Sequence, residues 1–405
     1  MRNVVFVAPY PLETTMSFVA GLSSLDDVRM LGIFQKPPEG PSAAAFADIA
    51  LVPDVFDANL LTEAGKVLAQ RHGKIHRFLG VLEELQVPLA VARERLDVAG
   101  TSSKTAHVFR DKGHMKDALR AAGIQVARHS RIRSDKDAWR FIEDVGFPIV
   151  MKPPAGAGCR ATYRINHVQE LVSALQEIHP SESREVLGEE FLTGQEYSFE
   201  TITIDGKVRF HSLGRYYPSP LEVMENDWIQ WVVHMPKEID GPEFDAVKAV
   251  GPKVIQALGL DSGMTHMEWF RRADGSVAVG EIAARPPGAQ IVTLTGMVHD
   301  MDCVRQWARA VIDGAFDGPW ERKYSAGVAF LRGPGIGRIT GIDGLAEAQQ
   351  RMGHLVVKAQ LPRIGWNKST SYEGDGWAIV RDTDSTVVKQ ALFDLITTVK
   401  VRYAS

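Results

Sequence analysis

The segment 266–283 constrains the fold more than any other part of the sequence, because two apolar runs flank an Asp274-Gly275 dipeptide. Such a dipeptide between apolar-patterned runs is a strong signal for a two-residue turn of a β-hairpin. If these two residues form the turn, the pairing of the strands places Glu268 directly opposite Glu281. The sequence therefore predicts a hairpin that carries two facing carboxylates on one side.

Two carboxylates directly opposite each other destabilise a strand pair, so something must compensate. A divalent cation does so, because Mg2+ prefers carboxylate oxygens and commonly takes one or two of them together with nucleotide phosphates. Arg285, just past the second strand, could meet a phosphate or carboxylate with its planar guanidinium. The alternative, from these residues alone, is a solvated hairpin face with Arg285 as a surface ion-pair partner.

Length and composition favour a multidomain globular protein. The 405 residues exceed what one hydrophobic core usually serves, and 45% apolar with 24% charged residues is ordinary usage. A formal charge of -4 without a Lys/Arg-rich run argues against a nucleic-acid partner. Cys159 and Cys303 support no disulfide framework, which suits a reducing cytoplasm. No stretch approaches a membrane span, so we expect a cytoplasmic protein without a membrane partner.

Residues 1–103 are expected to form a small α/β domain. The pattern predicts strands at 3–8, 28–34 and 48–54 and helices at 13–25 and 59–86. A short apolar run at 88–92 completes an alternation typical of a parallel sheet with crossover helices.

The rest of the chain shows strands and helices in mixed order, which indicates an α+β layout. We expect one region at 104–315 and a C-terminal α+β subdomain at 316–405. Helices are predicted near 110–122, 168–178, 242–260 and 386–399.

A loop after an apolar strand is the first candidate phosphate site. Lys152 ends the strand "FPIVMKP", and Gly156 and Gly158 follow among small neighbours. Backbone N–H groups of such a loop can meet phosphate oxygens while the lysine adds a charge, although the P-loop spacing is absent. Lys112, at a predicted helix start, is a second candidate. The alternatives are an ordinary turn and a solvated lysine.

The segment "GEEFLTGQEYSFE" is the candidate adenine and ribose site. Phe191 and Leu192 could pack on an adenine beside backbone amides, and Glu189 or Glu196 could bind polar groups of the nucleoside. Taken alone, the segment is equally a hairpin with charged faces.

In this order, the segments resemble the ATP-grasp superfamily, and specifically its carboxylate-amine ligases such as the L-amino acid (dipeptide) ligases. The resemblance runs from Lys112 to Arg285, with a compatible N-terminal α/β domain and C-terminal subdomain. It implies an ATP-grasp architecture in which residues 1–103 form the domain that precedes the nucleotide-binding region.

The resemblance also implies a role for each candidate. Lys112 and Lys152 would contact ATP phosphates, Glu189 and the hinge backbone adenine, Glu196 the ribose, Glu268 and Glu281 Mg2+ (or Mn2+ in its place), and Arg285 the transferred phosphate or acyl intermediate. The implied reaction activates a small carboxylic acid with ATP to an acyl phosphate and ADP, which an amine then attacks. Phosphoryl transfer needs mainly positioning and charge neutralisation, so no nucleophilic side chain is required. The resemblance leaves open whether the protein forms a homodimer.

One departure from the family pattern concerns the metal. Many members carry Asn two residues after the second glutamate, where this chain has Ala283, which puts the mode of holding a second Mg2+ in doubt. Two alternatives therefore stay open: a biotin-carboxylase-like enzyme, although the sequence has no biotin-attachment segment, and a non-catalytic nucleotide-binding regulatory protein.

The substrate candidates come from a second part of the sequence. The aromatic segment 214–236 has little periodicity and is expected to be a loop or lid over an organic acid, or packing between subdomains. His266 lies on the same strand face as Glu268, and the alternative for it is a structural histidine. The substrate candidates are His266, Tyr216, Trp228, Trp231 and Gly288.

Overall fold

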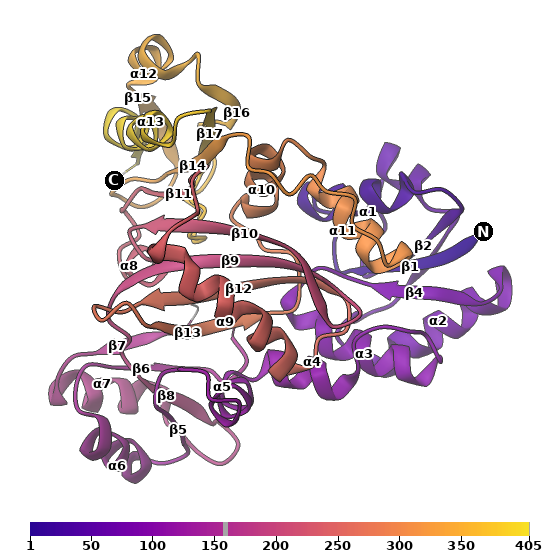
Figure 1. Ribbon diagram of the computed structural model, residues 1–405, viewed down its shortest axis with the longest axis horizontal. Helices are drawn as coiled ribbons and strands as arrows, with labels where there is room; N and C mark the ends of the chain where they lie inside the picture. Colours follow the sequence, from indigo (N-terminus) through magenta and orange to yellow (C-terminus); the bar gives the residue numbers. More distant parts are fainter. Residues whose placement is uncertain (157–160, 405) are drawn as a thin grey trace.

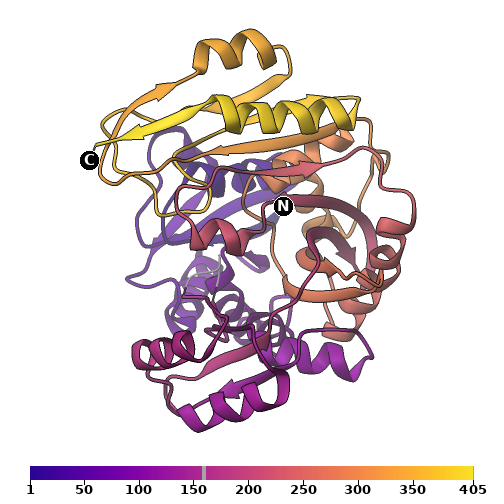
Figure 2. The ribbon, with the colours of Figure 1, turned by 90° about the vertical axis from the view of Figure 1, so that its left-hand side faces the viewer.

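The structure, a computed structural model, describes residues 1–156 and 161–404. Within these residues the strands form four sheets, of four, eight, two and four strands. Figure 1 shows the eight-stranded sheet in the middle, the N-terminal sheet to its right and the second four-stranded sheet below it. The turned view in Figure 2 places that second sheet at the bottom and the C-terminal helices at the top.

The N-terminal part is a parallel sheet with helices, as predicted. Its strand order is β3-β2-β1-β4, and β1 pairs in parallel with both β2 and β4. The elements are β1 Arg2–Ala8, α1 Glu13–Ser23, β2 Val28–Phe34, η1 Gly40–Ala45, β3 Asp48–Leu51, α2 Ala58–His72, β4 Ile75–Leu79, η2 Glu83–Leu85 and α3 Gln86–Arg95.

The prediction for the end of this part was wrong. The expected helix over 59–86 stops at His72, because Gly73 adopts a φ of +87° that ends α2 and lets the chain turn back as strand β4. The apolar run 88–92, expected as a strand, lies inside helix α3. Short apolar runs do not distinguish a buried strand from a buried helical face, and here Pro88 sits in the first helical turn, where proline is tolerated.

Helices α4 Ser103–Arg110 and α5 Lys112–Ala121 lead into the small sheet, whose order is β5-β8-β6-β7. Both helices are capped, since Ser102 accepts from the amide of Thr105 and Asp111 from that of His114. The elements of this unit are β5 His129–Ile132, α6 Asp135–Val145, β6 Ile149–Lys152, β7 Tyr163–Ile165, α7 Val168–Ile178 and β8 Val186–Glu190.

The large sheet is antiparallel throughout and has the order β13-β12-β9-β10-β11-β14-β17-β16. It runs past residue 316, where we expected a boundary, because β14 pairs with β11. Its strands are β9 Gln195–Ile204, β10 Lys207–Tyr217, β11 Trp231–Met235, β12 Gly263–Arg271, β13 Val277–Ala283, β14 Ser325–Leu331, β16 Val356–Gln360 and β17 Gly376–Asp382. The helices are α8 Pro220–Glu225, α9 Pro242–Leu258, α10 Ile291–His299, α11 Cys303–Asp313, α12 Leu345–Met352 and α13 Ser385–Thr398, and β15 Ile339–Asp343 pairs with β18 Lys400–Tyr403.

The aromatic segment 214–236 is more regular than predicted. It contains the end of β10, helix α8 and strand β11. Tyr216 and Trp231 are almost fully buried on neighbouring central strands. The alternative of an irregular lid was therefore wrong, because these aromatic residues are spaced for strand faces, whereas the burial of Tyr216 and Trp231 agrees with the other alternative, a packing role.

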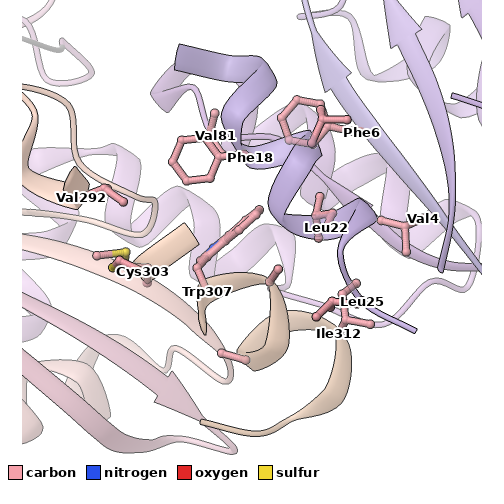
Figure 3. Packing of buried hydrophobic residues seen from close by; sticks show 14 of the residues in the cluster. Val4, Phe6, Phe18, Leu22, Leu25, Val81, Val292, Cys303, Trp307 and Ile312 are labelled. Atoms are coloured by element: carbon pink, nitrogen blue, oxygen red, sulfur yellow. The ribbon is translucent and has the colours of Figure 1, made fainter. Parts of the chain in front are cut away.

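A hydrophobic cluster fixes the N-terminal domain on the rest of the molecule. Helix α1 packs on α11, where Phe18 and Trp307 meet edge to face with ring centroids 5.2 Å apart (Figure 3). The helices approach closely at Gly21, where a Cβ would lie 2.6 Å from Cγ1 of Val304. This packing positions η2, which begins with Glu83, next to Arg285 at the end of the large sheet.

Candidate active site

Two neighbouring cavities lie along strands β12 and β13 and share Glu268 and Glu281. The first cavity, of about 780 Å³ with its open mouth, lies between the small and large sheets. It is lined by Lys112, Val150, Lys152, Pro153, Gly156, Thr162, Glu189, Glu190, Phe191, Leu192, Glu196, Leu221, Glu268, Phe270, Gly280 and Glu281. The second cavity, of about 730 Å³, is lined by Glu83, Tyr216, Pro220, Trp231, His266, Glu268, Glu281, Ala283, Arg285, Gly288, Ala289, Ile291 and Tyr372.

The hairpin places Glu268 opposite Glu281, as predicted, but by a different route. The connection is a three-residue loop, since the amide of Arg272 bonds the carbonyl of Ser276 and Gly275 takes a φ of +80°. The predicted two-residue turn was therefore wrong, because the loop contains one residue more than expected. Gly280 forms a β-bulge, because Trp269 pairs with Val279 and the next residue, Glu268, pairs with Glu281, so that Gly280 has no partner on β12. The bulge moves the pairing by one residue and restores the predicted Glu268–Glu281 pair.

Three lysines surround the carboxylates of the first cavity. Lys112 Nζ lies 2.9 Å from Glu281, and Lys152 Nζ lies 3.0 Å from Glu189. Lys116, one turn further along α5 and fully buried, lies 3.1 Å from Glu189 and donates to the carbonyl of Gly280 at 2.5 Å. Lys116 thus connects the small sheet to the bulge beside Glu281.

Burial and charge act in opposite directions on Glu189. Burial alone would raise its pKa, but Lys116 and Lys152 outweigh burial and hold the pKa at about 2. Burial raises the pKa of Glu196 well above its ordinary value, and the nearby Glu268 carboxylate adds to the effect. Burial would likewise raise the pKa of Glu281, but Lys112 and Lys152 bring it below its ordinary value.

The remaining predicted nucleotide residues line the first cavity as well. Gly156 accepts hydrogen bonds through its carbonyl from Lys112 Nζ and Arg110. Phe191 and Leu192, which follow strand β8, and Glu196, in strand β9, line the cavity. Gly158, the second predicted glycine of the loop, and Cys159 lie outside the described residues.

Glu268 and Glu281 have the chemistry of a magnesium site. No group of three or more His, Cys, Asp and Glu side chains in the described part of the chain is arranged to hold a metal by itself. A facing carboxylate pair at the wall of a cavity suits Mg2+, because this ion commonly binds one or two carboxylates and completes its coordination with waters and phosphate oxygens, without a full set of protein ligands. Ala283 offers no further ligand and lines the second cavity.

The second cavity gathers four of the five substrate candidates. Tyr216, Trp231, His266 and Gly288 line it, whereas Trp228 is 54% exposed and is not among its lining residues. The indole N–H of Trp231 donates to the carbonyl of Tyr372 at 2.7 Å. This bond ties a loop of the C-terminal part to the cavity wall.

Two side chains orient the polar end of the second cavity. Arg285 Nε lies 2.8 Å from the carboxylate of Glu83, and its Nη1 donates to the carbonyl of Pro286 at 2.9 Å. His266 Nδ1 lies 3.0 Å from the fully buried Glu200, and its Nε2 lies 3.7 Å from Glu268. Burial would lower the pKa of His266, but these two carboxylates raise it to about 9.

Sequence reasoning missed Lys116, Phe270, Glu83 and Tyr372. Lys116 had a usable signal, since it follows Lys112 by one helical turn and therefore faces the same side. Phe270 also had a signal, since it follows Glu268 by two residues on β12 and so lies on the same strand face, although the bulge shifts its pairing with β13 by one residue. Glu83 and Tyr372 reach the site only through tertiary packing, and no local pattern marks them.

Comparison with known proteins agrees with this geometry. Residues 117–300 match the ATP-grasp domain family. An L-arginine-specific L-amino acid ligase from Bacillus subtilis is 27% identical over 277 residues, which cover 66% of this chain and 65% of the relative. Among solved structures, an L-amino acid ligase from Bacillus licheniformis has a TM-score of 0.81 at 18% identity and covers 100% of this chain and 99% of that chain. N5-carboxyaminoimidazole synthetase from Staphylococcus aureus complexed with ADP has a TM-score of 0.72 at 16% identity, covering 97% and 96%.

Residues 117–300 therefore form an ATP-grasp domain, and the chain has the fold of the matched L-amino acid ligase structure. The relatives include L-amino acid ligases, and these findings confirm the resemblance to the ATP-grasp superfamily and the fold class predicted from the sequence. It spans 65% of the length of the Bacillus subtilis ligase. In the described part of the chain, no helix has the length and apolar character that crossing a membrane requires.

Proposed function

We propose that the protein joins a small carboxylic acid to an amine, with ATP converted to ADP and an acyl phosphate as the intermediate. One observation carries the proposal: two cavities meet at Glu268 and Glu281, one lined by lysines and the other by Arg285 and aromatic side chains. A nucleotide in the first cavity and an acid in the second would bring the γ-phosphate and the carboxylate together at the glutamate pair.

Each polar side chain then has a task in phosphoryl transfer, which depends on positioning and on neutralising the phosphate oxygens. Lys112 and Lys152, now paired with Glu281 and Glu189, would take phosphate oxygens as further partners. Glu268 and Glu281 would hold Mg2+, which supplies charge neutralisation when bound. Arg285 would orient the acid and the transferred phosphate with its planar guanidinium.

The acid that suits the second cavity is amino-acid-like. Aromatic rings of Tyr216, Trp231 and Tyr372 line it, together with the small residues Gly288 and Ala289. The names of the matched relatives, which include L-amino acid ligases, support the same substrate class.

Phosphate release with Mg-ATP, measured across a matrix of amino acids with and without a second amine, tests the proposal. A product whose mass equals the two substrates minus water, formed together with ADP, would support it and identify both substrates. Release that depends on bicarbonate instead would favour the biotin-carboxylase-like alternative. ATP binding without any acid-dependent release across the matrix would count against the ligase proposal and favour a regulatory protein.

A further inference from the structure

A third cavity, here called the outer cavity, adjoins the second cavity on the side away from the nucleotide site. Its volume with the open mouth is about 1010 Å³, and it shares Glu83, Arg285, Gly288 and Tyr372 with the second cavity. The lining residues unique to it are mostly hydroxylic or apolar, with one further carboxylate, Glu84. The wall comes from α1, the segment 81–84 and the segment 370–372, and therefore from both ends of the chain.

The order of the cavities limits how a second substrate can reach the reaction. In the proposed reaction, ADP occupies the first cavity and the acyl phosphate lies in the second, with its phosphate toward Glu268 and Glu281. The amine must attack the acyl carbon from a direction that the nucleotide leaves open. The outer cavity is the described space that meets the second cavity on that side.

Glu83 stands where the second and outer cavities meet. Its side chain is 10% exposed and lies 2.8 Å from Arg285 Nε, and it belongs to the N-terminal domain that α1 and α11 hold in place. His266 has its ring nitrogens directed at Glu200 and Glu268, and Glu83 is the one carboxylate that lines both the second and the outer cavity in the described part of the chain. Glu83 is therefore the carboxylate best placed to face an incoming amine.

We propose that the amine substrate reaches the acyl phosphate through the outer cavity and that the Glu83 carboxylate accepts a proton from its nitrogen. The inference rests on the proposed function. An amine arrives as an ammonium ion and must lose a proton before its lone pair can form the C–N bond. That proton passes to Glu83, the acyl C–O bond breaks with its electron pair on phosphate, and the second proton leaves with phosphate as HPO4²⁻.

Arg285 makes this role of Glu83 compatible with phosphoryl transfer. Its guanidinium contacts Glu83 through Nε, and the second cavity lies beside it. When a phosphorylated acid is present, the arginine gains a second anion, which weakens its hold on the Glu83 charge. Two carboxylates, Glu83 and Glu84, and the hydroxyls of Thr14, Thr370 and Ser371 further suit a cationic, polar amine.

The experiment compares two nucleophiles in Glu83→Gln. Hydroxylamine is neutral at pH 7 and traps an acyl phosphate as a hydroxamate without a base, whereas an amino acid amine must first lose a proton. We expect Glu83→Gln to form the hydroxamate near the wild-type rate and to form the amide about 100-fold more slowly, the usual contribution of a general base. Glu83→Asp keeps a carboxylate and should retain more amide formation than Glu83→Gln.

Glu63→Gln is the matched control, because Glu63 belongs to the same domain but pairs with Lys66 on the exposed face of α2. Amide formation by Glu83→Gln at the wild-type rate would overturn the inference. So would an equal loss of hydroxamate and amide with a raised KM for the acid, which would make Glu83 part of the acid site. Failure of the wild-type protein to form any hydroxamate would instead refute the proposed function itself.

Discussion

Replacing Glu189 by glutamine tests how the buried charges of the first cavity support each other. Glu189 is 5% exposed and is the anion shared by Lys116 and Lys152, at 3.1 and 3.0 Å. Glu189→Gln preserves the size of the side chain but leaves the fully buried ammonium group of Lys116 and the partly buried one of Lys152 without their common counter-charge. Removing one partner from a buried ion pair usually costs about 3–5 kcal/mol.

The lowered pKa of Glu189 gives a second measure of how much these two lysines stabilise the folded protein. A fall from the ordinary value of 4.5 to about 2 corresponds to about 3 kcal/mol of folding stability. Because the folded-state pKa lies below the unfolded value, this contribution is fully present above pH 4.5 and is lost as the pH falls toward 2. At about pH 3.5 it should have decreased by roughly 1.4 kcal/mol.

Urea unfolding followed by tryptophan fluorescence measures both quantities. We expect Glu189→Gln to lower the free energy of unfolding by about 3 kcal/mol at pH 7, and the difference from wild type to shrink in acid. Glu190→Gln is the control, since Glu190 pairs at 2.7 Å with Arg128, whose side chain is 51% exposed, and should cost less than about 1 kcal/mol. Equal effects of the two substitutions at pH 7, or a difference that does not depend on pH, would refute the reasoning.

Three further substitutions probe the site. Glu281→Gln should abolish acid-dependent phosphate release with unchanged circular dichroism, because it removes a metal-binding charge at constant volume; near-normal release would contradict the metal assignment. Trp231→Phe removes the bond to Tyr372 and should raise KM for the acid but not for ATP; equal changes in both constants would speak against an acid cavity. Gly194→Ala should lower the unfolding free energy by about 2 kcal/mol or more in a urea titration, since φ is +135° and the new Cβ would lie 2.3 Å from the carbonyl oxygen of Arg271; wild-type stability would show that the turn relaxes freely.

The facing glutamates could be predicted because strand pairing is local and periodic. Glu268 and Glu281 lie in one hairpin, and their pairing depends on a short connection. The predicted register nevertheless succeeded only because two irregularities cancel. The loop has one residue more than expected, and the bulge at Gly280 adds one residue to β13, so both glutamates face the same side.

Residues brought in by tertiary packing could not be predicted in the same way. Glu83 reaches Arg285 across 202 positions of sequence, and it does so because α1 packs on α11. Tyr372 comes from the C-terminal part, where the carbonyl that receives the Trp231 indole leaves no signal in the side-chain pattern. Sequence periodicity shows which face of an element is buried, but not which distant element will cover it.

The charged side chains of the first cavity nearly balance one another. Three lysines, Lys112, Lys116 and Lys152, accompany four of the five carboxylates that line the cavity, namely Glu189, Glu196, Glu268 and Glu281, while the fifth, Glu190, pairs with Arg128. Because its pKa is raised well above the ordinary value, Glu196 adds less negative charge than the other three. The charges of these side chains are therefore close to balance, and a nucleotide with its metal would exchange partners at Glu281: a phosphate would replace this carboxylate on Lys112 as the metal takes it, while Lys116 stays with Glu189. Such an exchange gives each of the groups that change partners a new counter-charge, which avoids the cost of an unpaired buried charge.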